Sequence, residues 1–159
     1  MIKKALGSAR HPSLLEPLGL IREDGKRADG MTIFPWKNGR SLVWDATGVD
    51  TLAPSYLTLT SKNVAAAANK AENKKKDLYK TIMLNHEFVP FALESLGPFS
   101  DGTRRFVDEL GKKLIEESGD KRAKSFFIQR IGIEVQRGNA AKIMGTVPNG
   151  DLMNELYYL

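Results

Sequence analysis

Short apolar stretches bounded by turn-forming residues fill the first third of the chain and predict three β-strands. Pro17 in the first stretch suits a strand at a sheet edge. Asn38-Gly39, between the second and third, is a pair that favours a type I′ hairpin turn. We therefore expect an antiparallel meander that follows the last turns of a short helix. The expected strands span residues 14–21, 31–36 and 41–47, and the helix residues 1–9.

Further along, apolar residues recur at helical spacing, with one more strand-like run between them. An Ala- and Lys-rich segment predicts a long helix over Ser61 to Thr81. A compact apolar run predicts a fourth strand over Phe88 to Ser95, where Pro90 is tolerated at an edge or bulge. Two further helices are expected over residues 103–117 and 123–137, the first ended by Gly119. The order is that of an α/β domain with an αβββαβ core, a mixed four-stranded sheet and a helical C-terminal extension.

Length and composition exclude several classes of protein. With 159 residues, 42% of them apolar, the chain suits one core, which we expect over residues 1–147 with a tail over 148–159. The lack of cysteine excludes disulfide scaffolds and zinc fingers, and two histidines leave carboxylates as the material for a metal site. No apolar run is long enough to span a membrane or to form a signal-peptide core, so an intracellular protein is expected.

Basic residues are in excess, with a formal net charge of +5 and an isoelectric point near 9.4. They gather in two segments, one between Lys70 and Lys80 and one between Arg104 and Lys124. Such patches suit a polyanionic partner such as nucleic acid. Ordinary surface charge is the alternative interpretation.

Asp45 is an unusual residue for its position, in the middle of Leu-Val-Trp-Asp-Ala-Thr. Side chains alternate across a strand, so Val43, Asp45 and Thr47 share one face. An unpaired buried carboxylate costs several kcal/mol, so Asp45 requires a cation. A salt bridge to a neighbouring Lys or Arg would satisfy it, and so would a metal ion.

The predicted Ala-rich helix offers a matching lysine. At about 100° per residue, Lys75 lies near the centre of a mostly apolar stripe, while Lys74 and Lys76 project to either side. The stripe comprises Val64, Ala67, Ala68, Ala71, Lys75, Leu78 and Tyr79. A lysine on the face that packs against the sheet is either the ion-pair partner of Asp45 or a catalytic group. Tyr79, one turn later, would hydrogen-bond a phosphate or simply pack.

Three segments together resemble a known family. They are Lys26-Arg27-Ala28-Asp29-Gly30, Leu42-Val43-Trp44-Asp45-Ala46-Thr47 and Ala71-Glu72-Asn73-Lys74-Lys75-Lys76-Asp77-Leu78-Tyr79. This set resembles the restriction-like endonuclease of site-specific non-LTR retrotransposons, a branch of the PD-(D/E)XK superfamily. In that branch the third-strand motif is Asp-X-Thr and the lysine lies in the following helix. Asp29 and Asp45 match the two aspartates, Thr47 the vacated lysine position, and Lys75, favoured over Lys76 by helical phase, the relocated lysine.

The resemblance implies a fold, an activity and a site. The fold is restriction-endonuclease-like, and the activity is Mg²⁺- or Mn²⁺-dependent hydrolysis of DNA in the nucleus, within or derived from a reverse-transcriptase protein. Asp29 and Asp45 would bind the metal with the main-chain carbonyl of Ala46, with Glu16 as an accessory ligand, and Lys75 would orient water or neutralise the phosphate. The residues expected to contact nucleic acid are Lys74, Lys76, Tyr79, Arg104 and Arg105.

The sequence departs from the family pattern in three respects, the first being that the N-terminal helix of the superfamily is mostly missing. Ala28 replaces the proline before the first aspartate, and no reverse-transcriptase domain accompanies the motifs within these 159 residues. Two rival interpretations stay open: an inactive restriction-like fold that binds nucleic acid or a protein partner, and a structural α/β protein in which Asp45 and Lys75 form only an ion pair. The target site and the oligomeric state are not predicted.

Overall fold

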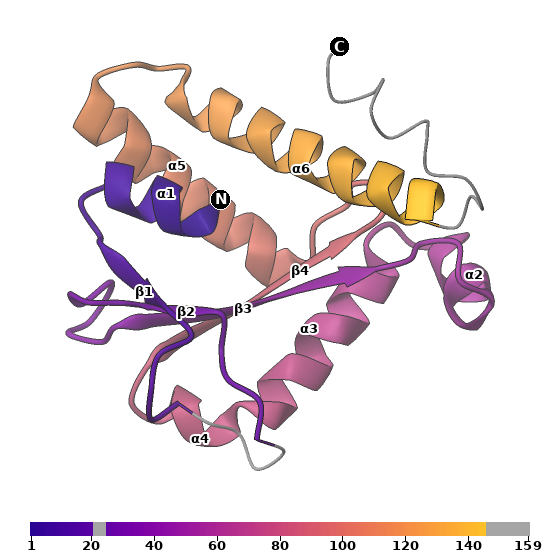
Figure 1. Ribbon diagram of the computed structural model, residues 1–159, viewed down its shortest axis with the longest axis horizontal. Helices are drawn as coiled ribbons and strands as arrows, with labels where there is room; N and C mark the ends of the chain where they lie inside the picture. Colours follow the sequence, from indigo (N-terminus) through magenta and orange to yellow (C-terminus); the bar gives the residue numbers. More distant parts are fainter. Residues whose placement is uncertain (21–24, 146–159) are drawn as a thin grey trace.

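A computed structural model describes residues 1–20 and 25–145, and within them one mixed four-stranded β-sheet forms the centre of the fold (Figure 1). The spatial order is β1-β2-β3-β4, with antiparallel pairing up to β3 and parallel pairing between β3 and β4. The sequence-based prediction of a mixed four-stranded sheet is therefore confirmed. The strands are β1 (Ser13–Leu15), β2 (Gly30–Thr32), β3 (Leu42–Val49) and β4 (Glu87–Glu94).

Helices cover both faces of this sheet (Figure 1). On one face lie α1 (Ile2–Ser8), α5 (Asp101–Ser118) and α6 (Ala123–Gly145), and on the other α3 (Ala66–Leu78) and α4 (Lys80–Met83). The helices between β3 and β4 form the crossover that a parallel strand pair requires. With the strand and helix order α1-β1-β2-β3-α3-β4-α5-α6, the expected αβββαβ core and C-terminal helices are present.

Strand parity sorts the buried side chains into two layers. Leu42, Trp44 and Phe91 face the larger core, where they pack with residues of α1, α5 and α6 such as Leu6, Leu110 and Ile131. Val43, Asp45 and Ala92 face α3. The second layer is small because α3 presents alanines to the sheet, so its backbone lies close to β3 and β4.

The predicted Asn38-Gly39 turn is confirmed. Asn38 and Gly39 both have positive φ (51° and 72°), as a type I′ turn requires, and the N–H of Arg40 donates to the carbonyl of Lys37 at 2.8 Å. Strand lengths were predicted less well. The first strand ends at Leu15 and the second at Thr32, well before Ile21 and Trp36. Glu16 has φ +46°, which breaks the extended backbone before Pro17.

The predicted helix over Ser61 to Thr81 is wrong in its extent. Residues 61–65 form turns, with Ala65 in a left-handed conformation (φ 61°), so α3 begins at Ala66. An additional helix, α2 (Pro54–Thr60), precedes it and was not predicted. Pro54 lies at the first helical position, where its missing N–H is harmless, and this was the available signal. At the other end, α6 continues to Gly145, eight residues beyond Arg137.

Within residues 1–20 and 25–145, no helix is both long and apolar enough to cross a membrane. The predicted tail over 148–159 lies outside the described residues.

Candidate functional site

Asp45 and Lys75 form an ion pair between the sheet and α3. The side chain of Asp45 is 7% exposed and that of Lys75 is 21% exposed, and the ammonium Nζ contacts Oδ2 of the carboxylate. Asp45 lies in the middle of β3, directly opposite Pro90 of β4, on the face that α3 covers. The prediction that these two residues meet is confirmed.

Asp29 lies beside this pair. It precedes Gly30, the first residue of β2, and its Oδ2 accepts a hydrogen bond from the main-chain N–H of Ala46 at 2.7 Å. Gly30 pairs with Trp44, so the register brings Asp29 next to Asp45. Gly30 cannot be replaced here without a shift, because an added Cβ would lie 2.1 Å from the Trp44 ring. The tight packing of Gly30 against Trp44 fixes the position of the neighbouring Asp29.

The carbonyl of Ala46 is directed towards the Asp29 side of β3. In a strand, the N–H and C=O of one residue point to the same edge. The N–H groups of Leu42 and Ala46 donate to Thr32 and Asp29, which lie on the β2 side. The carbonyls of Ser41 and Val49 accept from Glu87 and Ser95 on the β4 side, as odd-numbered residues should. The carbonyl of Ala46 is therefore turned to the same edge as the Asp29 carboxylate.

Charge crowding is evident in the titration of Asp29. Burial is the main cause that raises its pKa above the ordinary value of 3.8, and the nearby carboxylates of Asp45 and Glu16 raise it further. The hydrogen bond from Ala46 and the charge of Lys75 act in the opposite direction without cancelling the rise. Glu16 is close enough to contribute, and its main-chain N–H donates to the carbonyl of Asp29 at 3.0 Å. The site therefore carries more negative charge than Lys75 neutralises.

This donor set fits a hard divalent cation. Carboxylate and carbonyl oxygens are the ligands that Mg²⁺ prefers, and Mg²⁺ commonly takes one or two carboxylates from a protein and keeps several waters. The described residues contain no group of three or more His, Cys, Asp or Glu side chains arranged to hold a metal. A metal at this site would therefore depend on Asp29, Asp45 and the Ala46 carbonyl, the three ligands that the family resemblance implies.

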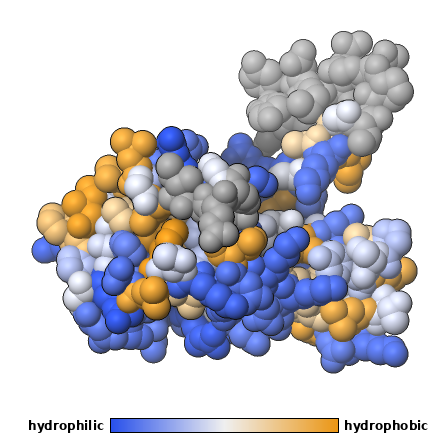
Figure 2. Space-filling view, turned by 90° about the horizontal axis from the view of Figure 1, so that it is seen from below, coloured by the Kyte–Doolittle hydropathy of each residue, from blue (hydrophilic) through white to orange (hydrophobic). Residues whose placement is uncertain are grey.

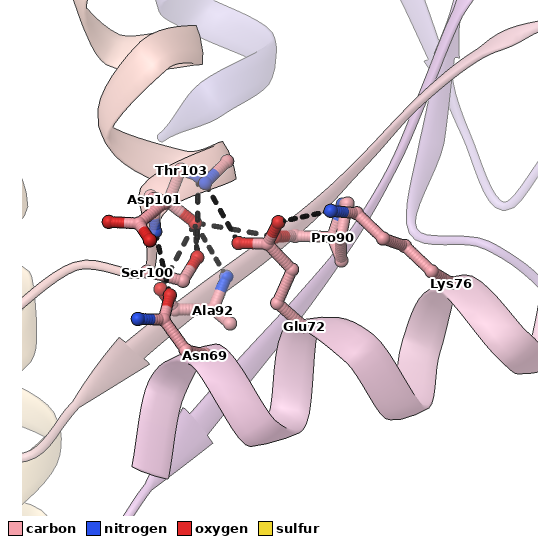
Figure 3. Close-up of polar contacts among 9 residues, drawn as sticks. Asn69, Glu72, Lys76, Pro90, Ala92, Ser100, Asp101 and Thr103 are labelled. Atoms are coloured by element: carbon pink, nitrogen blue, oxygen red, sulfur yellow. Dashed lines mark hydrogen bonds and ion pairs between the residues drawn. The ribbon is translucent and has the colours of Figure 1, made fainter. Parts of the chain in front are cut away.

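Two further carboxylates are buried, one facing α3 from the sheet and one on α3 itself, and sequence reasoning did not identify them as buried. Glu94, at the end of β4, is 1% exposed, and its Oε1 accepts from the N–H groups of Ala67 and Ala68 at 3.0 and 3.3 Å. Glu72 is 3% exposed, and its Oε2 accepts from the N–H of Gly102 at 2.8 Å while its Oε1 pairs with Lys76. Figure 3 shows Glu72 turned from α3 towards the first turn of α5.

These contacts hold α3 in place. Free N–H groups at a helix start need acceptors, and carboxylates are favoured there by the helix dipole. Glu94 supplies acceptors for α3, and Ser100, Glu72 and Asn69 supply them for α5, since Asn69 Oδ1 accepts from the N–H of Asp101 at 2.9 Å (Figure 3). Burial raises the pKa of Glu72, but hydrogen bonds from Lys76, Ser100 and Gly102 outweigh burial and lower it overall.

The predicted nucleic-acid contacts do not form one cluster. Lys74 and Lys76 point about 100° to either side of Lys75, and Lys76 is paired with Glu72 on the α5 side. Arg105 lines the same small cavity as Lys76, about 250 Å³ in volume, whereas Lys74 and Arg104 are exposed. Tyr79 is 1% exposed and its ring stacks on Phe88 with centroids 4.5 Å apart, so packing is the alternative that the structure supports.

The outer surface of α3 belongs to a hydrophilic band on this side of the molecule (Figure 2). The apolar stripe predicted for the helix is correct at Ala67, Ala68 and Ala71 but not at Val64 and Leu78, which are 79% and 44% exposed. Glu72, which the predicted stripe did not include, is buried instead.

Comparison with known proteins adds no identification. No protein-family model matches the chain, and no curated protein is significantly similar to it in sequence.

Proposed function

We propose that this chain is a metal-dependent DNA endonuclease of the restriction-like type, derived from the reverse-transcriptase protein of a non-LTR retroelement and acting in the nucleus. The observation that carries the proposal is the convergence of Asp29, Asp45 and Lys75 on the α3-covered face of a mixed sheet with αβββαβ order. The sequence motifs suggest the same three residues, so the motif resemblance and the spatial arrangement support one site.

Phosphodiester hydrolysis needs a group that neutralises the phosphate, a positioned water and a base or ion to activate that water. Asp29, Asp45 and the carbonyl of Ala46 would hold Mg²⁺ or Mn²⁺. Glu16 would add negative charge near the site without acting as a third acidic ligand. When bound, the ion would stabilise charge on the scissile phosphate and lower the pKa of a coordinated water. Lys75, which otherwise neutralises Asp45, would donate to a phosphate oxygen or orient the water. One water is consumed for each P–O bond broken.

The test is cleavage of single-stranded, duplex and branched DNA with Mg²⁺, with Mn²⁺ and with a chelator. We expect divalent-dependent cleavage that Asp45→Asn abolishes, because this change keeps the size of the side chain and removes the charge that attracts the cation. Lys75→Ala should reduce cleavage far more than Lys74→Ala, since only Lys75 reaches the carboxylates. A melting curve for each variant separates loss of the site from loss of the fold. If folded wild-type protein cleaves none of the three substrates, the proposed endonuclease activity is refuted.

One observation favours a second candidate, a catalytically inactive fold that binds nucleic acid or a protein partner. Lys75 already satisfies Asp45, and in the described part of the chain no third acidic side chain completes a metal cluster. The inactive fold would bind DNA with little sequence preference through Lys74, Lys76, Arg104 and Arg105. Its affinity would fall steeply with salt, because phosphate contacts release counterions. Binding of this kind without cleavage, unchanged by Asp45→Asn, would select the second candidate.

A further inference from the structure

A cavity of about 570 Å³ lies on the face of the sheet opposite Asp45. We call it the α1–α6 cavity, because α1 and α6 form two of its walls and β3 with β4 forms its floor. Its lining is mainly apolar and includes Ile2, Trp44, Phe91, Leu93, Ile131 and Val135. Volume and lining are those of small-molecule sites, which are mostly apolar pockets of about 300–1,000 Å³ with a few polar groups.

Two glycines in the walls contribute no side chain to this space. Gly48 lies inside strand β3 and Gly138 inside helix α6, and both line the cavity. Glycine in an element interior costs roughly 0.5–1 kcal/mol relative to alanine. A Cβ added at either position would meet nothing within 4 Å, and neither residue has the positive φ that would require glycine. Neither turn geometry nor close packing therefore accounts for the two glycines. A glycine inside a strand often marks close approach of a ligand.

Positive charge surrounds the opening. Lys3 and Lys4 of α1 and Lys142 of α6 line the cavity, and none of the three has an ion-pair partner among the described residues. Glu134 is the acidic residue of the lining, and it already faces two arginines, Arg130 at 3.6 Å and Arg137 at 3.7 Å. The rim therefore favours an anion, while the interior favours a hydrocarbon.

We propose that the α1–α6 cavity binds a single-chain amphiphile with an anionic headgroup, of the fatty-acid type. The hydrocarbon chain would lie along the lining residues that keep exposed apolar surface, Leu15, Leu93 and Val135, beside Gly48 and Gly138. The headgroup would pair with Lys142 and with Lys3 or Lys4. The cavity lies across the sheet from Asp45 and Lys75, and the two sites meet only at Ala46, which lines the cavity while its main chain faces Asp29. The proposal uses none of the charged groups of the nuclease site.

Binding is tested on the full chain with monomeric dodecanoate, with dodecanol as the uncharged control. A ligand that binds the folded state raises its melting temperature, so dodecanoate should stabilise the protein and dodecanol should do so less. The indole N–H signal of Trp44 should shift in an NMR titration, while that of Trp36, which lies outside the cavity lining, should not. A lower melting temperature with both ligands, or equal shifts at both tryptophans, would indicate detergent-like unfolding and overturn the proposal.

Variants test the apolar interior and the basic rim of the α1–α6 cavity separately. Gly48→Val places two methyl groups in the cavity without backbone strain, so we expect an unchanged or higher melting temperature and at least tenfold weaker dodecanoate binding. Gly138→Leu makes the same test from α6 should Gly48→Val fail to fold. Lys142→Glu should weaken dodecanoate and leave dodecanol unchanged. Full affinity in both glycine variants would refute the cavity as the site. Association with phosphatidylglycerol vesicles but not with monomeric dodecanoate would refute the single-chain ligand in favour of a membrane surface.

Discussion

Two pairs of carboxylates lie on α3 or on the sheet near it, Glu72 with Glu94 and Asp29 with Asp45, and the two pairs differ in how well they are satisfied. Glu72 and Glu94 each accept hydrogen bonds from main-chain N–H groups at a helix start, and Glu72 also pairs with Lys76. Asp45 is held by Lys75, and Asp29 by one N–H from Ala46. The pKa of Glu72 is lowered and that of Asp29 is raised, so Glu72 is stabilised as an anion while Asp29 is not.

That difference separates structure from candidate function. Perturbation of a carboxyl towards a higher pKa by burial and neighbouring acids is common at catalytic and metal sites. Carboxylates that cap helices instead have enough donors and add stability. The comparison therefore predicts that loss of Glu72 or Glu94 harms the fold, whereas changes at Asp29 mainly alter cation binding and activity.

The largest effect on stability is expected for Glu94→Ala. It leaves the N–H groups of Ala67 and Ala68 without an acceptor in a buried position, at roughly 1–3 kcal/mol for each unsatisfied group. We expect the free energy of unfolding, measured in urea, to fall by about 2–4 kcal/mol. Glu94→Gln, which keeps an acceptor, is the matched control and should lose less. Equal losses in the two variants would mean that the negative charge of Glu94, which both variants remove, matters rather than the presence of an acceptor.

The second largest effect is expected for Lys75→Ala. The free energy of unfolding should fall by about 1–3 kcal/mol, because the substitution leaves the buried Asp45 carboxylate without its cation. Lys74→Ala should change stability by less than about 0.5 kcal/mol, as expected for an exposed residue. Mg²⁺ should restore part of the stability of Lys75→Ala if the site accepts a divalent ion. Identical melting curves for the two lysine variants would show that the ion pair contributes nothing.

Acid should reveal the contribution of Glu72. Because its pKa in the folded protein is lowered, its stabilisation is present above the ordinary pKa of 4.5 and is lost as the pH falls through the folded value. Glu72→Gln keeps an acceptor for Gly102 but not the charge that pairs with Lys76. We expect this variant to be less stable by about 1–2 kcal/mol at pH 7 and to approach the wild type below the folded pKa. If the difference in the free energy of unfolding between Glu72→Gln and the wild type stays constant over this pH range, the charge of Glu72 does not contribute to stability.

The smallest effect, of opposite sign, is expected for Asp29→Asn. A carboxyl with a raised pKa binds more protons when folded than when unfolded, so stability falls as the pH rises from 3.8 through the folded value. Asparagine removes this penalty and can still accept the hydrogen bond from Ala46. The melting temperature should therefore rise slightly at pH 7 and match the wild type in acid, and Mg²⁺ should stabilise only the wild type. Destabilisation by Asp29→Asn at pH 7 would contradict the crowding of charge.

The three-stranded meander, the mixed four-stranded sheet and the Asp45–Lys75 pair could be predicted from the sequence because each depends on local regularities, whereas the place of β4 beside β3 was not predicted. Strand alternation places Asp45 on one face, helical phase places Lys75 on the matching stripe, and Asn38-Gly39 specifies the hairpin. These periodicities are the same in any fold that contains the same helices and strands. The same reasoning overestimated the lengths of β1 and β2 and joined the turn at residues 61–65 to the helix. The ends of helices and strands depend on single backbone conformations, such as the left-handed one of Ala65, which periodicity does not reveal.

Only the tertiary structure decided that Glu72 and Glu94 are buried. Glu72 and Glu94 are surface-like residues in sequence, and their burial depends on the approach of the α5 and α3 helix starts, which supply the missing donors. Gly102 allows that approach, since a Cβ there would lie 2.5 Å from Glu72 Oε1. The α1–α6 cavity likewise has no periodic signature, because segments distant along the chain form its walls. Local sequence patterns determine which face a side chain takes, whereas burial of a charge depends on partners that only the packed fold brings within hydrogen-bonding distance.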